Sequence, residues 1–152
     1  MLYELITNKV LVVSVCAWAV TQLLKVVATL VRERRLDFRY LLASGGMPSS
    51  HSAVVGALVT SVAMLQGLSS VAFGIAAVLA LIVMYDSAGV RQSVGQQSVV
   101  LIRIVQEFRF RRPIAELERD LREFLGHTPF QVIVGAIIGI LIAWLWLAIP
   151  NM

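Results

Sequence analysis

The order of apolar and polar residues predicts four long apolar helices separated by polar segments. Apolar runs cover residues 10–31, 48–65, 71–86 and 129–149, approximately. Most of these runs are close to the ~20 residues that an α-helix needs to cross a bilayer. None alternates apolar and polar residues as a membrane barrel strand does. We therefore expect an all-α integral membrane bundle of about four transmembrane helices, forming a single domain over residues 1–152.

A further helix of different character is expected between the third and fourth apolar runs. Arginines and acidic residues interleave there, and Pro113 is well placed to start a helix. Four apolar residues follow it at helical spacing: Ile114, Leu117, Leu121 and Phe124. This pattern predicts an amphipathic helix over about 113–125 that lies on the cytoplasmic membrane surface or packs under the bundle. Most of its charges are expected to form a solvated face.

Small residues recur at four-residue steps on two of the apolar runs. In the second run these are Ser52, Gly56 and Thr60, with Ala53 and Ala57 beside them. In the last run the stripe is formed by His127, Gln131, Gly135, Gly139 and Ala143. Small residues at this spacing let membrane helices approach closely, so each stripe predicts a tightly packed neighbour. A homodimer through such a glycine face is a further hypothesis.

The composition supports a membrane protein. The chain is 59% hydrophobic, only 14% of its residues are charged, and its mean hydropathy is +0.84. A soluble domain of this length could not bury so much apolar side chain. The N-terminus lacks the pattern of a cleavable signal peptide, and the lone Cys16 excludes an internal disulfide and a cysteine-based metal site. Membrane lipids, and no nucleic acid, are the expected partners.

Basic residues predict the orientation in the membrane. Apart from Lys9 and Lys25, every Lys and Arg lies in 32–39, at Arg91, or in 103–122. With four spans, these segments fall on one side, which should be the cytoplasmic side of the cell membrane. Both termini would then lie on the opposite side.

Polar groups from four separate elements are expected to meet at the arginine-rich side. The first helix carries a stripe of mostly polar residues made of Ser14, Trp18, Gln22, Lys25, Thr29 and Arg32. The second helix starts in the string Gly-Gly-Met-Pro-Ser-Ser-His-Ser-Ala over 45–53, the third ends at Tyr85 and Asp86, and the fourth starts after His127. An ionisable residue inside a span should face protein or water, although the long Lys25 side chain could instead snorkel to the interface. This convergence predicts a functional site.

The residue types at this site suit a phosphorylated ligand. Lys25, Arg32 and Arg91 could neutralise phosphate oxygens. Ser49 and Ser50 could add hydrogen bonds at a helix N-terminus, which favours anions, with Pro48 expected in the first turn. Of the two histidines, His51 and His127, one could attack phosphorus and the other could protonate the leaving oxygen. A metal site built from both histidines and Asp86 is the competing chemistry, although this ligand set is a weak metal signal.

The motifs resemble the type 2 phosphatidic acid phosphatase superfamily, which includes vanadium haloperoxidases. Pro-Ser-Ser-His at 48–51 resembles its P-S-G-H motif, and the whole nonapeptide, with Tyr-Asp-Ser-Ala-Gly-Val-Arg at 85–91 and Leu-Gly-His-Thr-Pro at 125–129, resembles its divergent branch of small membrane proteins. The resemblance implies a helical protein that hydrolyses phosphomonoesters without a metal ion or another cofactor. It implies His127 as the nucleophile that forms a phosphohistidine and His51 as the general acid. Lys25 and Arg32 match the spacing of the first motif.

Several positions depart from the superfamily's pattern. Glu33 stands in place of a proline, and Ser50 in place of a glycine. Leu121 and Gln131 replace the arginine and aspartate that flank the nucleophilic histidine. Arg122 is one residue out of register, so Arg91 could supply the charge instead, and Gln131 could orient His127 by a hydrogen bond. Two hypotheses follow: a lipid-phosphate phosphatase, and a membrane protein that binds a phosphorylated lipid or anion without hydrolysing it.

Overall fold

The computed structural model describes residues 2–34, 47–89, 97, 100 and 128–149. Every regular element in these residues is an α-helix. The helices are α1 (Leu2–Thr7), α2 (Lys9–Glu33), α3 (Ser50–Gln66), α4 (Val71–Ala88) and α7 (Pro129–Ala148). The predicted all-α membrane bundle is confirmed. The expected surface helix over 113–125 lies outside the described residues.

Local capping explains where the long helices begin. Asn8, Ser49, Ser70 and Thr128 are the N-caps of α2, α3, α4 and α7, and each side chain accepts a hydrogen bond from a backbone N–H of the first turn. Because Ser49 takes the cap position, α3 begins at Ser50, and Pro48 lies before the helix. The expectation that Pro48 stands in the first turn is therefore wrong.

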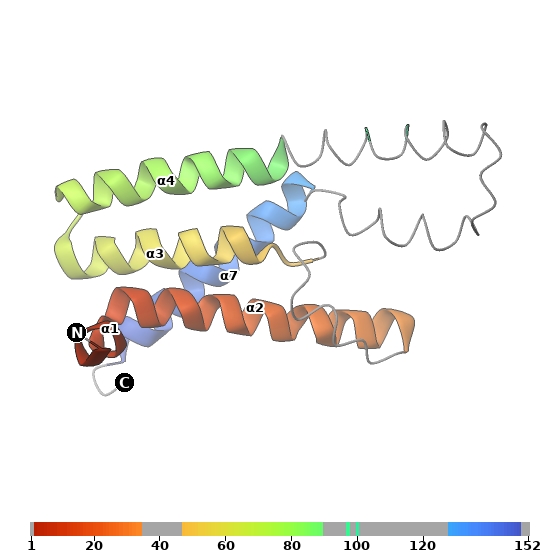
Figure 1. The fold of residues 1–152 in the computed structure, drawn as a ribbon, viewed down its shortest axis with the longest axis horizontal. Coiled ribbons are helices and arrows are strands. Elements are labelled where there is room, and N and C mark those ends of the chain that lie inside the picture. The colour runs from red at the N-terminus through yellow and green to blue at the C-terminus, as the bar shows by residue number, and fades with distance from the viewer. Residues whose placement is uncertain (1, 35–46, 90–96, 98–99, 101–127, 150–152) are drawn as a thin grey trace.

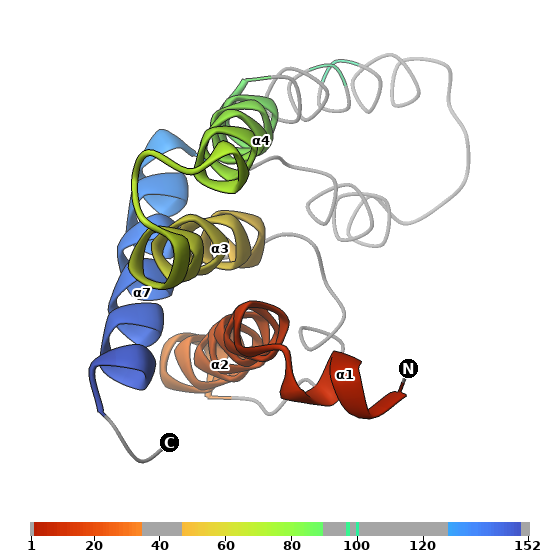
Figure 2. The same cartoon turned by 90° about the vertical axis from the view of Figure 1, so that its left-hand side faces the viewer.

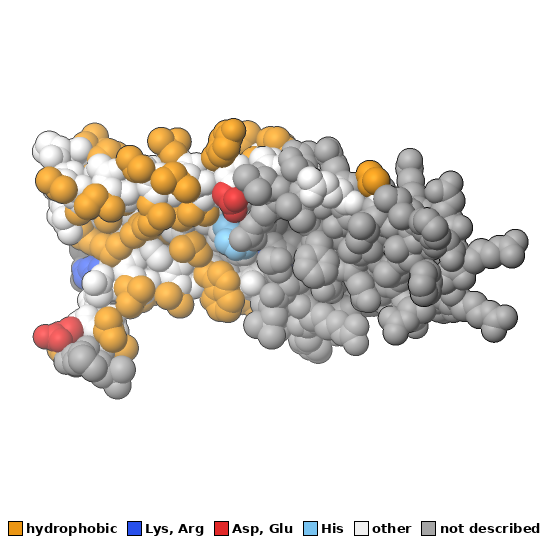
Figure 3. All heavy atoms as spheres, turned by 45° about the horizontal axis from the view of Figure 1, so that its top comes forward, with side chains coloured by type: hydrophobic (Ala, Val, Ile, Leu, Met, Phe, Trp, Pro, Cys, Tyr) orange, Lys and Arg blue, Asp and Glu red, His pale blue; other side chains and the backbone are white. Residues whose placement is uncertain are grey.

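Three of the helices are long and apolar enough to cross a membrane: Lys9–Val31, Val71–Ala88 and Pro129–Ala148. The fourth apolar helix, α3, has 17 residues, which corresponds to a rise of about 26 Å. This is slightly less than the ~30 Å hydrocarbon core of a typical bilayer. Apolar side chains cover much of the outer surface of the described helices (Figure 3), as expected where lipid replaces water.

The helices α2, α3 and α4 run side by side, and α7 crosses one side of this layer obliquely (Figures 1 and 2). Packing involves α7 mainly with α3, and also with α2 and α4. The interior is built from small residues, with Val13, Ala17, Ala57 and Ala143 forming a buried cluster. The start of α1 and the end of α7 lie at one end of the bundle, and the starts of α3 and α7 and the end of α4 lie at the other (Figure 1).

The glycines of α7 pack closely on α3, as their spacing predicts. A Cβ atom on Gly135 would collide with the carbonyl oxygen of Ser49, and one on Gly139 with that of Ala53. In the opposite direction, a Cβ on Gly56 would lie 2.8 Å from the carbonyl oxygen of Ala136. The glycine face is thus occupied within one chain, and a homodimer, which stays a prediction, would use another surface.

Candidate functional site

The Lys25 side chain is buried at the polar end of the bundle. Lys25 is only 1% exposed, and its Nζ lies 3.2 Å from Ser50 Oγ in the first turn of α3. The side chain therefore does not snorkel to the interface. Instead it crosses from α2 to the start of α3 and places a cationic group inside the bundle, where a counter-charge is expected.

The residues on the buried face of α2 differ in part from the predicted polar stripe. Ser14, Gln22 and Lys25 are buried as expected, but Trp18 is 42% exposed. Ala17 and Thr21, which the pattern did not single out, are fully buried in its place. The small side chains let neighbouring helices approach α2 on that side, and the large indole faces outward. Thr29 is half-buried, and the side chain of Arg32 lies outside the described residues.

The start of α3 is held by a short hydrogen-bond network. Ser49 Oγ accepts hydrogen bonds from the Ser52 backbone N–H at 3.4 Å and from the Ser52 hydroxyl at 3.1 Å. Ser49, Ser50 and Ser52 are all buried, and His51 is half-buried beside them. Ser49 therefore has a structural role as the N-cap of α3, besides its predicted role in binding phosphate. Ser52 belongs to the same motif, but its contribution to the network was not predicted.

The starts of α3 and α7 are joined directly. The backbone N–H of Ser49 donates to the carbonyl oxygen of Gln131 at 3.2 Å. Gln131 also closes a capping box with Thr128, in which its Oε1 accepts from the Thr128 backbone N–H at 3.0 Å. The half-buried side chain of Gln131 is therefore already engaged in starting α7. His127, the residue before Thr128, lies outside the described residues.

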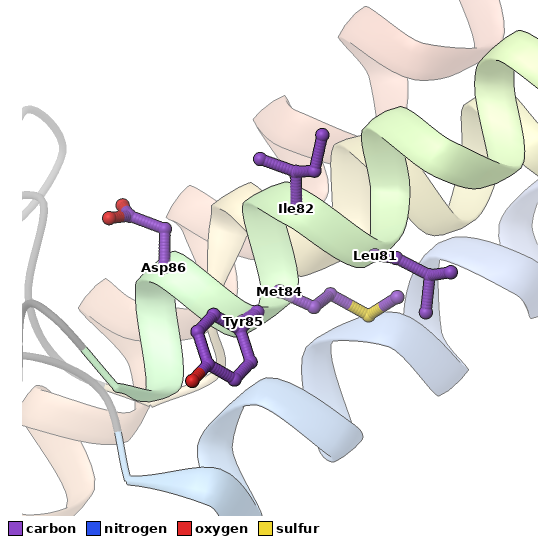
Figure 4. A pocket seen from close by; sticks show the side chains of 5 residues that line it. All are labelled: Leu81, Ile82, Met84, Tyr85 and Asp86. Atoms are coloured by element: carbon purple, nitrogen blue, oxygen red, sulfur yellow. The ribbon is translucent and has the colours of Figure 1, made fainter.

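The end of α4 contributes Asp86 to the same end of the bundle. Asp86 is half-buried and borders a surface pocket of about 690 Å³, lined also by Leu81, Ile82, Met84 and Tyr85. Figure 4 shows the carboxylate near the helix end, beyond the apolar side chains. In the described part of the chain, no three metal-ligating side chains gather at one point. Arg91 and His127 lie outside that part, so the alternative metal site is not tested by it.

The structure thus brings together four of the nine predicted site residues. Lys25, Ser49, Ser50 and Gln131 are linked by the contacts described above, and His51 lies next to Ser50 in the first turn of α3. Asp86 is in the last turn of the neighbouring α4, and this end of α4 lies at the same end of the bundle (Figure 1). A buried ammonium group beside a serine hydroxyl at a helix N-terminus is an arrangement suited to binding an anion.

Comparisons with known proteins identify the family of the chain. The model of the divergent PAP2 family matches residues 6–142. The Bacillus subtilis (strain 168) protein described as uncharacterized membrane protein YuiD is 40% identical over 148 residues, covering 91% of this chain and 94% of its own length. No solved structure matches the chain. The family match includes the nonapeptide and the other motifs on which the resemblance was based. This membrane protein therefore belongs to the divergent PAP2 family.

Proposed function

We propose that this protein is a membrane phosphatase that hydrolyses a phosphomonoester, and that its substrate is a lipid phosphate. The contact between Lys25 and Ser50 carries the proposal. It places a buried cation and a hydroxyl at the N-terminus of α3, inside the motif that resembles the phosphate-binding motif of the superfamily. In this mechanism, Lys25, Ser50 and the first backbone N–H groups of α3 stabilise the negative charge on the phosphoryl oxygens.

The reaction proceeds in two steps and uses neither a metal nor a cofactor. His127 attacks phosphorus, the bond from phosphorus to the leaving oxygen breaks, and His51 donates a proton to that oxygen. Water then attacks the phosphorus of the phosphohistidine, and His51 accepts a proton from this water. The bond between phosphorus and His127 breaks, which releases inorganic phosphate and restores the imidazole. Arg32 and Arg91 add positive charge around the phosphoryl group. Asp86 and Gln131 are assigned supporting roles at the rim of the site.

Phosphate release from the purified protein in lipid nanodiscs tests this function. A panel of lipid phosphates is offered with and without a chelator, and His127→Ala is measured beside the wild type. We expect release that resists the chelator and disappears in the folded variant, because His127 forms the covalent intermediate. Release that requires a metal ion would contradict the mechanism and move the chemistry toward Asp86.

The alternative function is binding of a phosphorylated lipid or anion without hydrolysis. Gln131 favours it, because this residue replaces the superfamily's aspartate and its Oε1 accepts the Thr128 N–H. An amide cannot stabilise an imidazolium as a carboxylate does. A binding protein would hold lipid phosphates tightly without turnover, and Lys25→Ala would weaken binding more than His127→Ala. A phosphatase would instead lose all turnover in His127→Ala.

We further propose that the site faces the cytoplasm. The Lys and Arg residues outside α2 concentrate in the connections at the site end of the bundle, and such connections stay on the cytoplasmic side of a membrane. The enzyme would then act on lipids of the inner leaflet.

A further inference from the structure

Gln22 carries a buried polar atom to which the proposed mechanism gives no role. The residue is 5% exposed, and its Oε1 finds no hydrogen-bond donor in the described residues. Buried carbonyl oxygens nearly always have a donor in native proteins, so this oxygen requires either an ordered water or a ligand group. By contrast, the hydroxyl of the neighbouring Thr21 is satisfied by the carbonyl oxygens of Ala17 and Trp18, both at 2.8 Å.

The position of Gln22 relates it to the phosphate site. Gln22 precedes Lys25 by three residues, so the two lie on the same face of α2, and both are buried. Long side chains on a helix lean toward its N-terminus and cover the preceding turn. The Lys25 side chain therefore extends over the turn that carries Gln22 on its way to Ser50. Along α2, Gln22 lies about 4.5 Å closer to the middle of the bundle than Lys25.

We propose that Gln22 Oε1 accepts a hydrogen bond from the alcohol part of the ligand whose phosphate binds at Lys25 and Ser50. The placement of that phosphate rests on the proposed function. A doubly ionised phosphate monoester offers only acceptor oxygens, and an amide oxygen is itself only an acceptor. The donor must then come from a group below the phosphate, toward the hydrocarbon interior. A hydroxyl near the phosphate-bearing carbon of the alcohol meets both requirements.

This makes Gln22 a specificity-determining residue for the proposed reaction. The preferred substrate class is phosphomonoesters whose alcohol carries a free hydroxyl close to the phosphate. A simple alkyl phosphate lacks this group and would leave the amide oxygen buried without a donor. A site that has a buried polar group for a substrate hydroxyl discriminates against analogues that lack the hydroxyl.

Equilibrium binding of two matched lipids tests the inference. The probes are a monoalkylglycerol phosphate, which has a free hydroxyl, and an alkyl phosphate of the same chain length. Both are titrated into nanodisc-embedded His127→Ala protein, which binds without turning over the ligand. We expect the hydroxyl-bearing lipid to bind about tenfold more tightly, the equivalent of roughly one neutral hydrogen bond. Adding Gln22→Leu should bring the two dissociation constants together.

Thr21→Val is the matched control, because it removes a buried polar group on the same helix turn whose hydrogen bonds are already made within α2. It should keep the preference for the hydroxyl. A second substitution, Gln22→Met, supplies the same test if Gln22→Leu does not fold. Three outcomes would overturn the inference. They are equal binding of both probes to the His127→Ala protein, a preference for the hydroxyl that survives Gln22→Leu, and no binding of either probe. If the His127→Ala protein prefers the hydroxyl-bearing lipid but the wild type releases no phosphate, only the phosphatase proposal would be overturned.

Discussion

Gln131 serves the helix start while standing where the superfamily has an acid. Its Oε1 accepts the Thr128 N–H, and Thr128 Oγ1 in turn accepts the Gln131 N–H at 3.4 Å. Glutamate is an equally good partner in such a capping box. Position 131 can therefore hold either an amide or a carboxylate side chain without changing how α7 begins.

This equivalence yields a prediction for Gln131→Glu. The capping box should persist, so the thermal midpoint should stay close to that of the wild type. If His127 is the nucleophile, the new carboxylate should stabilise its imidazolium and raise the rate of phosphate release about tenfold or more. The initial rate in nanodiscs measures the effect. Gln131→Leu is the companion variant, and it should lose about 1 kcal/mol of stability because half of the box is missing. A rate that Gln131→Glu leaves unchanged would place Gln131 away from the reacting imidazole.

At the level of helices, the close crossing of α3 and α7 positions the site. Gly135 lies against the backbone of Ser49, the residue that caps α3, and Gly139 lies one turn further along, against Ala53. The Ser49 N–H to Gln131 bond forms at the same crossing. The glycines thus control the distance between the serine motif and the start of α7. His127 directly precedes Thr128, the N-cap of α7, in the sequence.

The glycine contact can be tested with a matched pair of substitutions. Gly139→Ala should destabilise the protein by about 1 to 3 kcal/mol, because the added methyl overlaps backbone atoms that cannot rotate away. Gly74→Ala in α4 is the control. Apart from its chain neighbours and the nearby backbone of α4, no atom of the described residues lies within 4 Å of the position of its added Cβ, so it should be neutral or stabilise by about 0.5 to 1 kcal/mol. Thermal unfolding in detergent measures both. Equal midpoints for the two variants would be incompatible with this crossing.

For the molecule as a whole, the site lies at one end of the bundle (Figure 1), which ties the proposed mechanism to one side of the membrane. The start of α1, the end of α7 and the turn between α3 and α4 lie at one end of the bundle, and the site lies at the other (Figure 1). Ser69, in the α3–α4 turn, and Met47, just before α3, are both exposed. They therefore offer positions for reporting the orientation.

Labelling of single cysteines in intact cells tests the orientation. In a Cys16→Ser background, a membrane-impermeant thiol reagent should label Ser69→Cys from outside the cell. It should label Met47→Cys only after permeabilisation, because basic connections remain in the cytoplasm. The reverse pattern would place the site on the outer face, and the proposed phosphatase would then act on lipids of the outer leaflet.

The sequence by itself determined the class of this protein, its four long apolar helices and the end of the bundle at which Lys25, Ser49 and Ser50 lie. These follow from local patterns: apolar runs of spanning length, capping residues, and the alternation of helix direction across a membrane. Even there, α1 was not predicted, because a helix of six residues is too short to show a periodic pattern.

Only the tertiary structure decided which faces meet. Whether Lys25 snorkels or is buried depends on whether another helix covers it, and the start of α3 does so. Trp18 faces outward because the interior beside it is filled by small side chains such as Ala17 and Thr21. The partner of the α7 glycines likewise depends on neighbours far away in sequence, and so does the lack of a donor to Gln22 Oε1 among the described residues. Spacing along one helix defines a stripe, but packing against the other helices decides what that stripe contacts.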